Sequence, residues 1–340
     1  MQRLRAQFAT LTSRLEKGRD RGASAVITAL MMVPIMILAA LAIDVGAMHA
    51  EQQQLQTGAD AGALAVAQDC ARDDCATTAA TAQSMASANL NAAGAIGEIE
   101  SLDETAGEVK VQTSAVREHW FAPIVGINST RLQAQSGARW GYPTGGTAVL
   151  PVAFSWCALT AQAGITVLRD PNGTVIGVNM PSTSAQRTIN FTKSSATTCT
   201  GPSGNAVPGG FGWLTPSSTN CGKTESIIGG WVGSDTGNNV PSPCNNAEFQ
   251  KWLGKTVLLP IFDQTRGTGN SGEYRVFWYA AFTLSGYYFA GQYSHPSPAP
   301  CGGSERCIRG SFDRFVDLTE NFDYSPSGPR MGAAVVALTE

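Results

Sequence analysis

Eight cysteines are the residues of this chain whose chemistry is easiest to predict. None of them lies in the first 69 residues, and their number is even. Thiols in an oxidising compartment form disulfides, so this distribution indicates bridges rather than free thiols. Zinc is the alternative, but the chain has no C-x2-C spacing, and we therefore expect disulfides. The eight are Cys70, Cys75, Cys157, Cys199, Cys221, Cys244, Cys301 and Cys307.

The pairing of these cysteines is predicted only from their neighbourhood in the sequence. The first two and the last two cysteines enclose short polar loops, and the remaining four have crossed arrangements that stay open, since eight cysteines allow many connectivities. Neighbourhood favours the pairs Cys70–Cys75, Cys157–Cys199, Cys221–Cys244 and Cys301–Cys307.

The histidines and serines form no recognisable catalytic pattern. The three histidines, His49, His119 and His295, lie far apart in the sequence. Ser203 and Ser271 each precede a glycine, but neither lies in the G-x-S-x-G pattern that exposes a nucleophilic serine. We therefore predict no catalytic residue, no cofactor and no enzymatic activity.

One group of oxygen-bearing side chains raises the question of calcium. Asp263, Asn270 and Glu273 surround two glycines, and oxygen ligands along a tight loop suit this ion. Their spacing matches no EF-hand, and a turn held by side-chain hydrogen bonds explains the same residues. We predict no metal site, and any small-molecule ligand stays unknown.

Composition and charge limit the classes of protein that fit. Apolar residues make up 43% of the 340 residues and charged residues only 14%, against roughly a quarter in typical soluble domains. Residues 1–22 hold six basic and two acidic residues, whereas the rest of the chain holds 17 basic and 24 acidic residues. Behind its basic tail the chain is mildly acidic, which argues against a nucleic-acid partner.

Residues 23–43 form an uncharged apolar stretch of 21 residues. As a helix this stretch is about 32 Å long, close to the ~30 Å hydrocarbon core of a bilayer. The basic tail precedes it, and Asp44 and Glu51 follow it, so the positive-inside rule places residues 1–22 in the cytoplasm and the later residues outside. We predict a single-pass anchor in the cytoplasmic membrane, with the lipid bilayer as a partner.

Two other interpretations of the apolar stretch are weaker. A cleaved secretory signal, with Ala40-Leu41-Ala42 as its cleavage site, would have an apolar region longer than the usual ~7–15 residues. A buried helix of a soluble protein does not explain the length or the change of charge across the stretch. Pro34 lies in the middle, and membrane helices tolerate such prolines.

The helix is predicted to continue outside the membrane over residues 44–69, which contain no proline. Small and apolar residues recur there at steps of three and four, which predicts one helix from about residue 23 to residue 68. Gly58 and Gly62 allow another backbone to approach closely. We favour a contact with this protein's own globular part over an intermolecular contact. The recurring residues are Leu55, Ala59, Gly62, Ala63 and Val66.

Residues 70–140 are predicted to form a small α/β module, and residues 148–340 a β-rich domain. The module combines an Ala-rich helix (76–92), strands at 95–102, 108–115 and 130–138, and a short helix at 118–125. Residues 141–148 are expected to be a turn-rich joint.

In the β-rich domain we expect a hairpin of strands 165–168 and 175–178 around Asp170–Gly173, strands at 256–262, 273–289 and 333–338, and a long loop at 193–246. The predicted fold class is α+β: a long N-terminal helix, the α/β module, and a disulfide-stapled sandwich or partly closed barrel.

An ordered set of residues along the helix carries a resemblance to a known family. Arg21 and Gly22 precede the apolar stretch, Asp44 and Gly46 follow it, and a second group lies one helical segment further on. Over about residues 21–67 the sequence resembles the N-terminal segment of TadE/TadG-like Flp pilus-assembly proteins. The second group consists of Leu55, Gln56, Asp60, Ala63 and Leu64.

The resemblance implies a membrane-anchored, TadG-like structural or assembly component of a tight-adherence (Flp) pilus system, with other pilus-assembly membrane proteins or pilins as partners. It also implies a prepilin-peptidase site between Gly22 and Ala23. Pilin-type members often have a glutamate at the fifth position after that cut, where this chain has Ile27. We therefore favour an uncleaved anchored protein over a polymerising pilin. The alternative function is a membrane-tethered adhesive or ligand-binding surface protein that is not incorporated in a pilus.

Overall fold

A computed structural model describes residues 2–90, 94–180, 185–191, 199–207, 211–216, 219–235, 237, 239–268, 271–291, 293–316 and 321–339. The chain divides into two compact units. The first unit comprises Met1–Gly62, Ala82–Glu98 and Val111–Gln135, and the second unit comprises Ala63–Thr81, Ile99–Lys110 and Ser136–Glu340.

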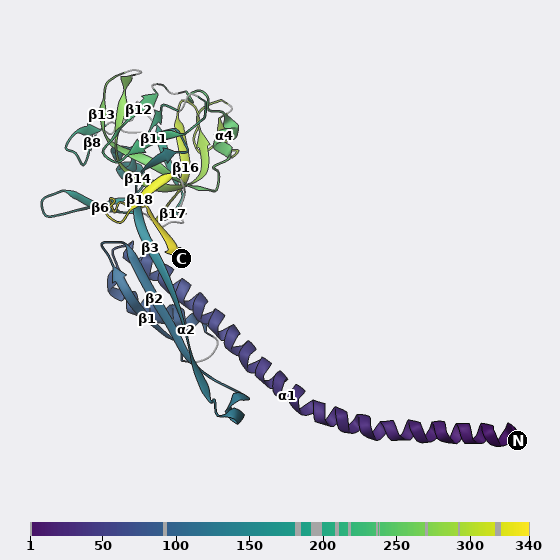
Figure 1. The fold of residues 1–340 in the computed structure, drawn as a ribbon. Helices are drawn as coiled ribbons and strands as arrows, with labels where there is room; N and C mark the ends of the chain where they lie inside the picture. Colours follow the sequence, from purple (N-terminus) through teal and green to yellow (C-terminus); the bar gives the residue numbers. More distant parts are fainter. Residues whose placement is uncertain are drawn as a thin grey trace. The chain divides into compact units, whose positions relative to one another are not determined.

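The long helix α1 runs from Gln2 to Cys70 (Figure 1). The predicted helix from about residue 23 to residue 68 is therefore present, and the basic tail continues it in the N-terminal direction. Pro34 lies inside the helix without ending it. The chain leaves the helix at Cys70, and Asp73 adopts a positive φ of 64° in the turn that follows.

Three short elements and three strands follow α1. Their bounds lie within a few residues of the predicted ranges, except that the short helix is a single 3-10 turn and the third strand is longer. They are η1 (Cys75–Thr77), α2 (Thr78–Asn89), β1 (Ile96–Asp103), β2 (Glu108–Glu118), η2 (Ala122–Val125) and β3 (Ser129–Ala148).

Small residues allow α1 to pack closely against α2 and β2 in the first unit. A Cβ atom added to Gly58 would lie 3.4 Å from Cα of Ala86, and one added to Gly62 would lie 3.2 Å from Cγ1 of Val111. The contact predicted for these two glycines is therefore made within the chain. The buried apolar core of this unit consists of Leu55, Ala59, Ala86, Leu90, Ala95, Ala115, Leu132 and Ala134.

The first sheet has seven strands, in the order β1-β2-β3-β19-β17, with β11 and β18 also paired to β3. The expectation of a turn-rich joint at residues 141–148 is wrong, because these residues are the second half of β3. Glycine makes this possible: a Cβ atom at Gly145 would lie 2.9 Å from Cγ2 of Ile227, and one at Gly146 would lie 2.3 Å from the carbonyl oxygen of Asn321. The same glycines that resemble a turn signal let β11 and β18 approach β3.

The remaining elements belong to the second unit, which is rich in strands, as predicted. They are β4 (Val152–Ser155), α3 (Trp156–Gln162), β5 (Thr166–Arg169), β6 (Val175–Asn179), β7 (Arg187–Phe191), β8 (Cys199–Thr200), β9 (Ala206–Val207), β10 (Phe211–Leu214), β11 (Thr224–Ile227), β12 (Trp231–Asp235), α4 (Asn246–Gln250), β13 (Thr256–Arg266), β14 (Glu273–Tyr288), β15 (Ser294–His295), β16 (Arg306–Asp313), β17 (Phe315–Val316), β18 (Phe322–Ser325) and β19 (Ala334–Thr339).

The second sheet has eight strands and closes on itself. Its order is β12-β10-β4-β13-β14-β16-β7, β15 pairs with β14, and an additional pairing joins β12 to β14. Strands β12, β10, β4, β13 and β14 thus form a closed ring, which is the barrel form of the predicted β-rich domain. Aromatic side chains such as Trp213, Trp278 and Phe282 are buried in its core.

Two expectations about this domain have different outcomes. The predicted hairpin is present as β5 and β6, and its turn is fixed by Asp170, which accepts hydrogen bonds from the backbone N–H groups of Asn172 and Thr174. The expectation of a loop at 193–246 is wrong for the described residues, which include the short strands β8 to β12. These strands have two to five residues, too few for an alternating pattern to be recognised.

Four disulfides connect the eight cysteines, and they are the pairs that sequence neighbourhood favours. Cys70–Cys75 joins the end of α1 to η1, Cys157–Cys199 joins α3 to β8, and Cys301–Cys307 closes a loop onto β16. The fourth pair is Cys221–Cys244. Bridges of this kind restrict the unfolded chain and so stabilise loop-rich domains.

Candidate functional site

The first candidate feature is the apolar segment of α1. Every residue from Ser24 to Ile43 is exposed except Ala40, which is half-buried. Apolar surface of this size is unfavourable in water and is matched by the hydrocarbon core of a bilayer. Within the residues that the structure describes, α1 contains the one helix long and apolar enough to cross a membrane, which fits a membrane-anchored protein.

Asp44, the residue that follows this segment, holds the connection between β2 and β3. We call this connection, residues 119–128, the tip loop. The Asp44 carboxylate accepts hydrogen bonds from the backbone N–H groups of Trp120 at 3.0 Å, Phe121 at 2.9 Å and Ala122 at 2.7 Å. These N–H groups precede or begin the 3-10 turn η2, where the backbone has no partners of its own. Asp44 therefore caps the turn from a different element of the chain.

The electrostatics of Asp44 follow from these contacts. Burial by itself raises the pKa of the carboxyl group, but the hydrogen bonds from three N–H groups and the nearby His119 outweigh it and hold the pKa below its ordinary value of 3.8. The group is therefore ionised at neutral pH, when the carboxylate is the best acceptor for the tip loop.

A second polar contact joins α1 to β2 at Glu51, seven residues after Asp44. The Arg117 guanidinium lies 2.8 Å from Oε2 of Glu51, and both side chains are mostly buried. The same guanidinium lies over the ring of Trp120, 5.3 Å from its centre. Arg117 therefore orients the first aromatic residue of the tip loop as well as neutralising a buried carboxylate.

Glutamines attach the other side of the helix to β3. The side-chain N–H of Gln52 donates to the carbonyl oxygen of Gln133 at 2.7 Å, and that of Gln56 donates to Gln135 at 3.1 Å. Gln56 also donates to Asp60 at 2.9 Å. Each backbone carbonyl would otherwise face solvent, so these contacts fix the rotation of α1 against the sheet within the first unit.

The residues that carry the family resemblance differ in burial and in the contacts that they make. Asp44, Leu55, Gln56, Asp60 and Ala63 make contacts within the chain or are buried, and Leu64 is half-buried. Gly22 and Gly46 lie on exposed positions of α1, where an added Cβ atom would meet nothing within 4 Å. Arg21 and Ala23 lie on α1, with side chains outside the described part. The structure therefore gives an intramolecular reason for most of this set and none for the two exposed glycines.

Sequence reasoning missed the tip loop as a feature. Five of its apolar side chains are exposed although no charged residue lies between positions 120 and 128. The signal in the sequence is this uncharged run, WFAPIVGIN, between two strands with charged residues. The exposed residues are Trp120, Phe121, Ile124, Val125 and Ile127.

The histidines and serines considered for catalysis do not meet. His49 is exposed on α1, the buried His119 makes a 2.8 Å hydrogen bond with the hydroxyl of Thr130, and His295 lies on β15. Among the described residues, no group of three His, Cys, Asp or Glu side chains could hold a metal ion.

Ser203 takes part in a different cluster, with Asp263 and Arg275. The serine hydroxyl donates to Oδ2 of Asp263, and the Arg275 guanidinium lies 3.0 Å from Ser203 Oγ and 3.3 Å from the same carboxylate. Burial raises the pKa of Asp263, and the Arg275 charge opposes that shift. This cluster attaches the turn after β8 to β13 and β14.

The residues considered for calcium are also held by other partners. Asp263 is paired with Arg275, and Glu273 is paired with Arg266. Asn270 lies outside the described residues. The two carboxylates thus have cationic partners, which agrees with a turn held by side-chain interactions.

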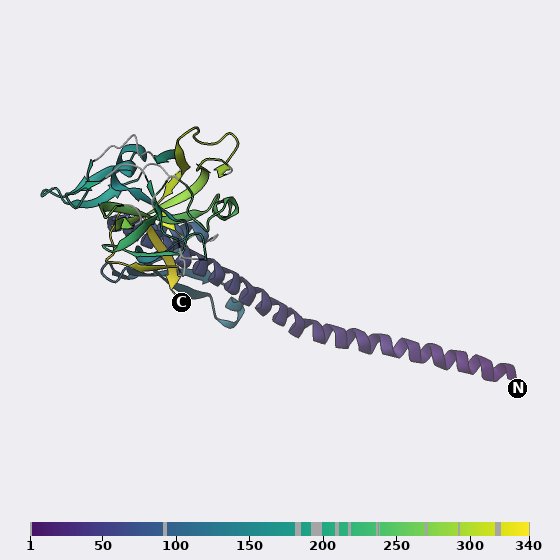
Figure 2. The same cartoon turned by 90° about the horizontal axis from the view of Figure 1, so that it is seen from above.

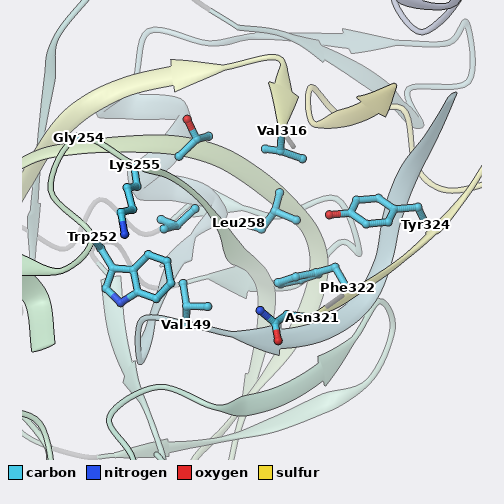
Figure 3. Close-up of a pocket in the computed structure, with 11 residues that line it drawn as sticks. Val149, Trp252, Gly254, Lys255, Leu258, Val316, Asn321, Phe322 and Tyr324 are labelled. Atoms are coloured by element: carbon cyan, nitrogen blue, oxygen red, sulfur yellow. The ribbon is translucent and has the colours of Figure 1, made fainter. Parts of the chain in front are cut away.

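A cavity of about 420 Å³ lies in the second unit (Figure 3). Its wall combines apolar side chains with a few polar groups, and the ammonium group of Lys255 lies 5.4 Å from the centre of the Trp252 ring. A cavity of this size is large enough for a small molecule with an apolar body. The labelled wall residues are Val149, Trp252, Gly254, Lys255, Leu258, Val316, Asn321, Phe322 and Tyr324.

Comparison with known families gives a match at the long helix α1. Residues 22–69 match the family Tad, whose description is "Putative Flp pilus-assembly TadE/G-like". This confirms the resemblance of the N-terminal segment and supports a role related to Flp pilus assembly. No curated protein and no solved structure matches the chain.

Proposed function

We propose that this chain is a membrane-anchored, TadG-like structural or assembly component of a Flp-type pilus system, with a non-catalytic domain outside the membrane. The observation that carries the proposal is that the family match and the clamped helix coincide. Residues 22–69 match the family, and the same residues contain an exposed apolar segment followed by Asp44, which binds the tip loop, and by Glu51 and Gln56, which bind strands of the sheet.

The division of α1 into an exposed half and a clamped half supports an anchor rather than a filament subunit. The helix face that carries Leu55 and Ala59 is buried against α2 and the sheet of the first unit. A polymerising subunit needs helix surface for its neighbours, and over residues 44–62 much of that surface is already used. We therefore place the partners of this chain, other pilus-assembly membrane proteins or pilins, at the apolar segment or on the globular part.

The orientation in the membrane belongs to the proposal as well. The basic residues 1–22 lie on the cytoplasmic side, and the domain with four disulfides lies outside the cytoplasm, where disulfides form. Charge and redox chemistry independently favour the same direction. The chain is then a cell-surface protein of the cytoplasmic membrane.

Deletion of the gene tests this function. We expect the deletion strain to lose most surface fibres in negatively stained electron micrographs, and a plasmid copy of the full chain to restore them. A plasmid copy that lacks residues 1–43 should not restore them, because it has no anchor. Normal fibres in the deletion strain would contradict the proposal.

A second candidate function is a membrane-tethered surface protein that binds a ligand. The 420 Å³ cavity beside Lys255 and Trp252 is the observation that favours it. In this case the deletion strain keeps its fibres and loses adhesion or ligand binding, and Lys255→Met combined with Leu258→Trp, which removes the ammonium group and fills the cavity, gives the same loss. The deletion experiment therefore separates the two functions.

A further inference from the structure

The tip loop presents an apolar surface that the first unit does not cover. Its side chains are exposed to 67% at Trp120, 86% at Ile124, 70% at Val125 and 53% at Ile127. Exposed apolar residues are ordinary when they are scattered, but four of them within eight residues of one loop indicate a contact surface.

The tip loop lies at the end of the membrane segment. Its three N–H groups bind Asp44, which directly follows the last residue of the apolar stretch, Ile43. The two elements belong to the same unit, and Figures 1 and 2 both show the β2–β3 connection beside α1. Leu41 and Val45, four residues apart on one side of the helix, are exposed apolar residues on either side of Asp44.

The direction of β2 agrees with this placement. The hydroxyl of Thr113 donates to the carbonyl oxygen of Leu55, Arg117 binds Glu51, and Trp120 binds Asp44, so β2 runs toward the apolar segment as α1 runs away from it. Seven residues of helix, from Glu51 to Asp44, rise about 10.5 Å, and the three residues from Arg117 to Trp120, at the end of β2 and the start of the tip loop, span at most about 10 Å. The two elements therefore reach the same level together.

The loop is held in shape rather than free to collapse. The backbone N–H of His119 donates to the carbonyl oxygen of Asn128 at 3.0 Å and closes the loop at its base. Gly126 ends the 3-10 turn with a φ of 89°, which favours glycine. The exposed apolar side chains are thus kept outward, and Arg117 fixes the ring of Trp120 among them.

The composition of the loop is that of a membrane interface. Tryptophan is enriched where hydrocarbon meets headgroups, since its ring is apolar and its N–H is polar. The charged residues Arg117, Glu118 and Arg131 lie just before and after the uncharged run, at the positions that would stay in the headgroup layer.

We infer that the tip loop enters the outer leaflet of the membrane beside α1, so that lipid acyl chains cover Trp120, Ile124 and Val125. This inference rests on the proposed anchoring of α1 and adds a second, shallow membrane contact to it. The chain is then fixed to the bilayer at two points, and the first unit cannot rotate freely about the axis of α1.

Lipid photolabelling of the full chain tests this inference. The protein is reconstituted in phosphatidylcholine vesicles that contain a phosphatidylcholine with a diazirine close to the carbonyl end of one acyl chain. After illumination, reduction and trypsin digestion, three peptides are compared by mass spectrometry: 22–72, which contains the membrane segment, 118–131, which contains the tip loop, and 111–117, which contains the exposed Val116 of β2.

We expect lipid adducts on peptides 22–72 and 118–131 and none above background on 111–117. Ile124→Glu should lower labelling of the tip loop about tenfold, because a carboxylate is unfavourable among acyl chains. Val116→Glu is the matched control, since Val116 is 62% exposed on the strand that leads to the loop, and it should leave the labelling of 118–131 unchanged. Both positions are exposed, so neither change should unfold the protein.

The other outcomes separate the two proposals. Adducts on 22–72 with none on 118–131 would overturn the lipid contact and leave the anchoring intact. The contact is also overturned if peptide 118–131 carries no lipid and is instead cross-linked to a second copy of the chain by an added chemical cross-linker. If neither peptide carries lipid, the anchoring itself is wrong.

Discussion

Asp44 shows how a single side chain can connect a membrane segment to the domain that follows it. A carboxylate at this position terminates the apolar stretch and accepts three backbone hydrogen bonds from a loop 76 to 78 residues later in the chain. Leu or Ala here would leave those N–H groups without an acceptor. An aspartate at this position is therefore explained by two facts: the apolar segment ends here, and the N–H groups at the start of η2 require an acceptor.

This arrangement predicts how the tip loop responds to pH. Because the pKa of Asp44 is lowered by the folded structure, the carboxylate stabilises the loop at every pH above its ordinary value of 3.8, and that stabilisation is lost as the pH falls below 3.8 through the lower, folded value. We expect the amides of Trp120, Phe121 and Ala122 to lose protection below pH 3.8, measured by hydrogen exchange normalised to intrinsic rates.

The variant Asp44→Asn separates the effect of protonating Asp44 from any pH effect of the other ionisable groups nearby, which are His119, Glu51 and Arg117. The variant has no charge to titrate, so the three amides should be less protected at neutral pH and should show no further loss between pH 3.8 and pH 2.5. Asp60→Asn, on the same helix but bound by Gln56, is the control and should keep the wild-type profile. Equal protection of the wild type and Asp44→Asn at neutral pH would contradict this role for Asp44.

At the scale of elements, the first unit depends on glycines where helix and sheet meet. A Cβ atom added to Gly97 of β1 would lie 2.4 Å from the carbonyl oxygen of Ala82 in α2, a distance that requires the backbone to move. Gly46 is the opposite case, since nothing lies within 4 Å of its added Cβ atom. Substitution by alanine is therefore expected to have opposite effects on stability at these two glycines.

We expect Gly97→Ala to lower the free energy of unfolding of the first unit by about 1–3 kcal/mol, because it overpacks a tight contact. Gly46→Ala should leave stability unchanged or raise it by about 0.5–1 kcal/mol, because alanine favours the helix. Hydrogen exchange of the buried backbone amides of α2 and β1, in detergent, measures both. If Gly46→Ala keeps stability and abolishes surface fibres, Gly46 contacts a partner. A stable Gly97→Ala variant would contradict the described packing of β1 on α2.

Much of the element order could be predicted from the sequence, and the failures have a physical cause. The continuous helix follows from its uninterrupted apolar and small-residue pattern, and β14 follows from its length and alternation. The glycine-rich half of β3 could not be predicted, because glycine marks a turn in local sequence and a close approach in tertiary structure. Whether Gly145 and Gly146 form a turn or a close contact between strands depends on β11 and β18, which are distant in the chain.

The candidate site was predictable only in part for a related reason. The apolar segment and the acidic residue after it are visible in the sequence, because both are local features. The partners of Asp44 and Glu51 lie on the tip loop and on β2, more than 60 residues away, and no local pattern identifies them. The uncharged run from Trp120 to Asn128 was the available signal, and its meaning depends on being next to a membrane segment.

At the scale of the whole molecule, topology and redox chemistry must agree. A tail with six basic residues lies before the apolar segment and all eight cysteines lie after it, and the described structure has no free cysteine. In the proposed orientation the four bridges lie outside the cytoplasm, where disulfides form, so the charge of the tail and the redox chemistry of the second unit favour the same direction.

This link gives a test of orientation that does not depend on pili. Thiol labelling after non-reducing denaturation should find no free thiols in the wild-type protein, and protease added to intact spheroplasts should digest the globular part. Replacing Arg3, Arg5, Arg14, Lys17, Arg19 and Arg21 by glutamine removes the positive charge that, in the proposed orientation, retains the tail in the cytoplasm. A fraction of that variant should insert in the opposite direction, be protected from the protease, and carry free thiols. The control variant, in which Lys251 and Lys255 are replaced by glutamine, should change neither the protease digestion nor the thiol labelling. Protection of the wild-type globular part in intact spheroplasts would reverse the orientation, and with it the reason for the disulfides.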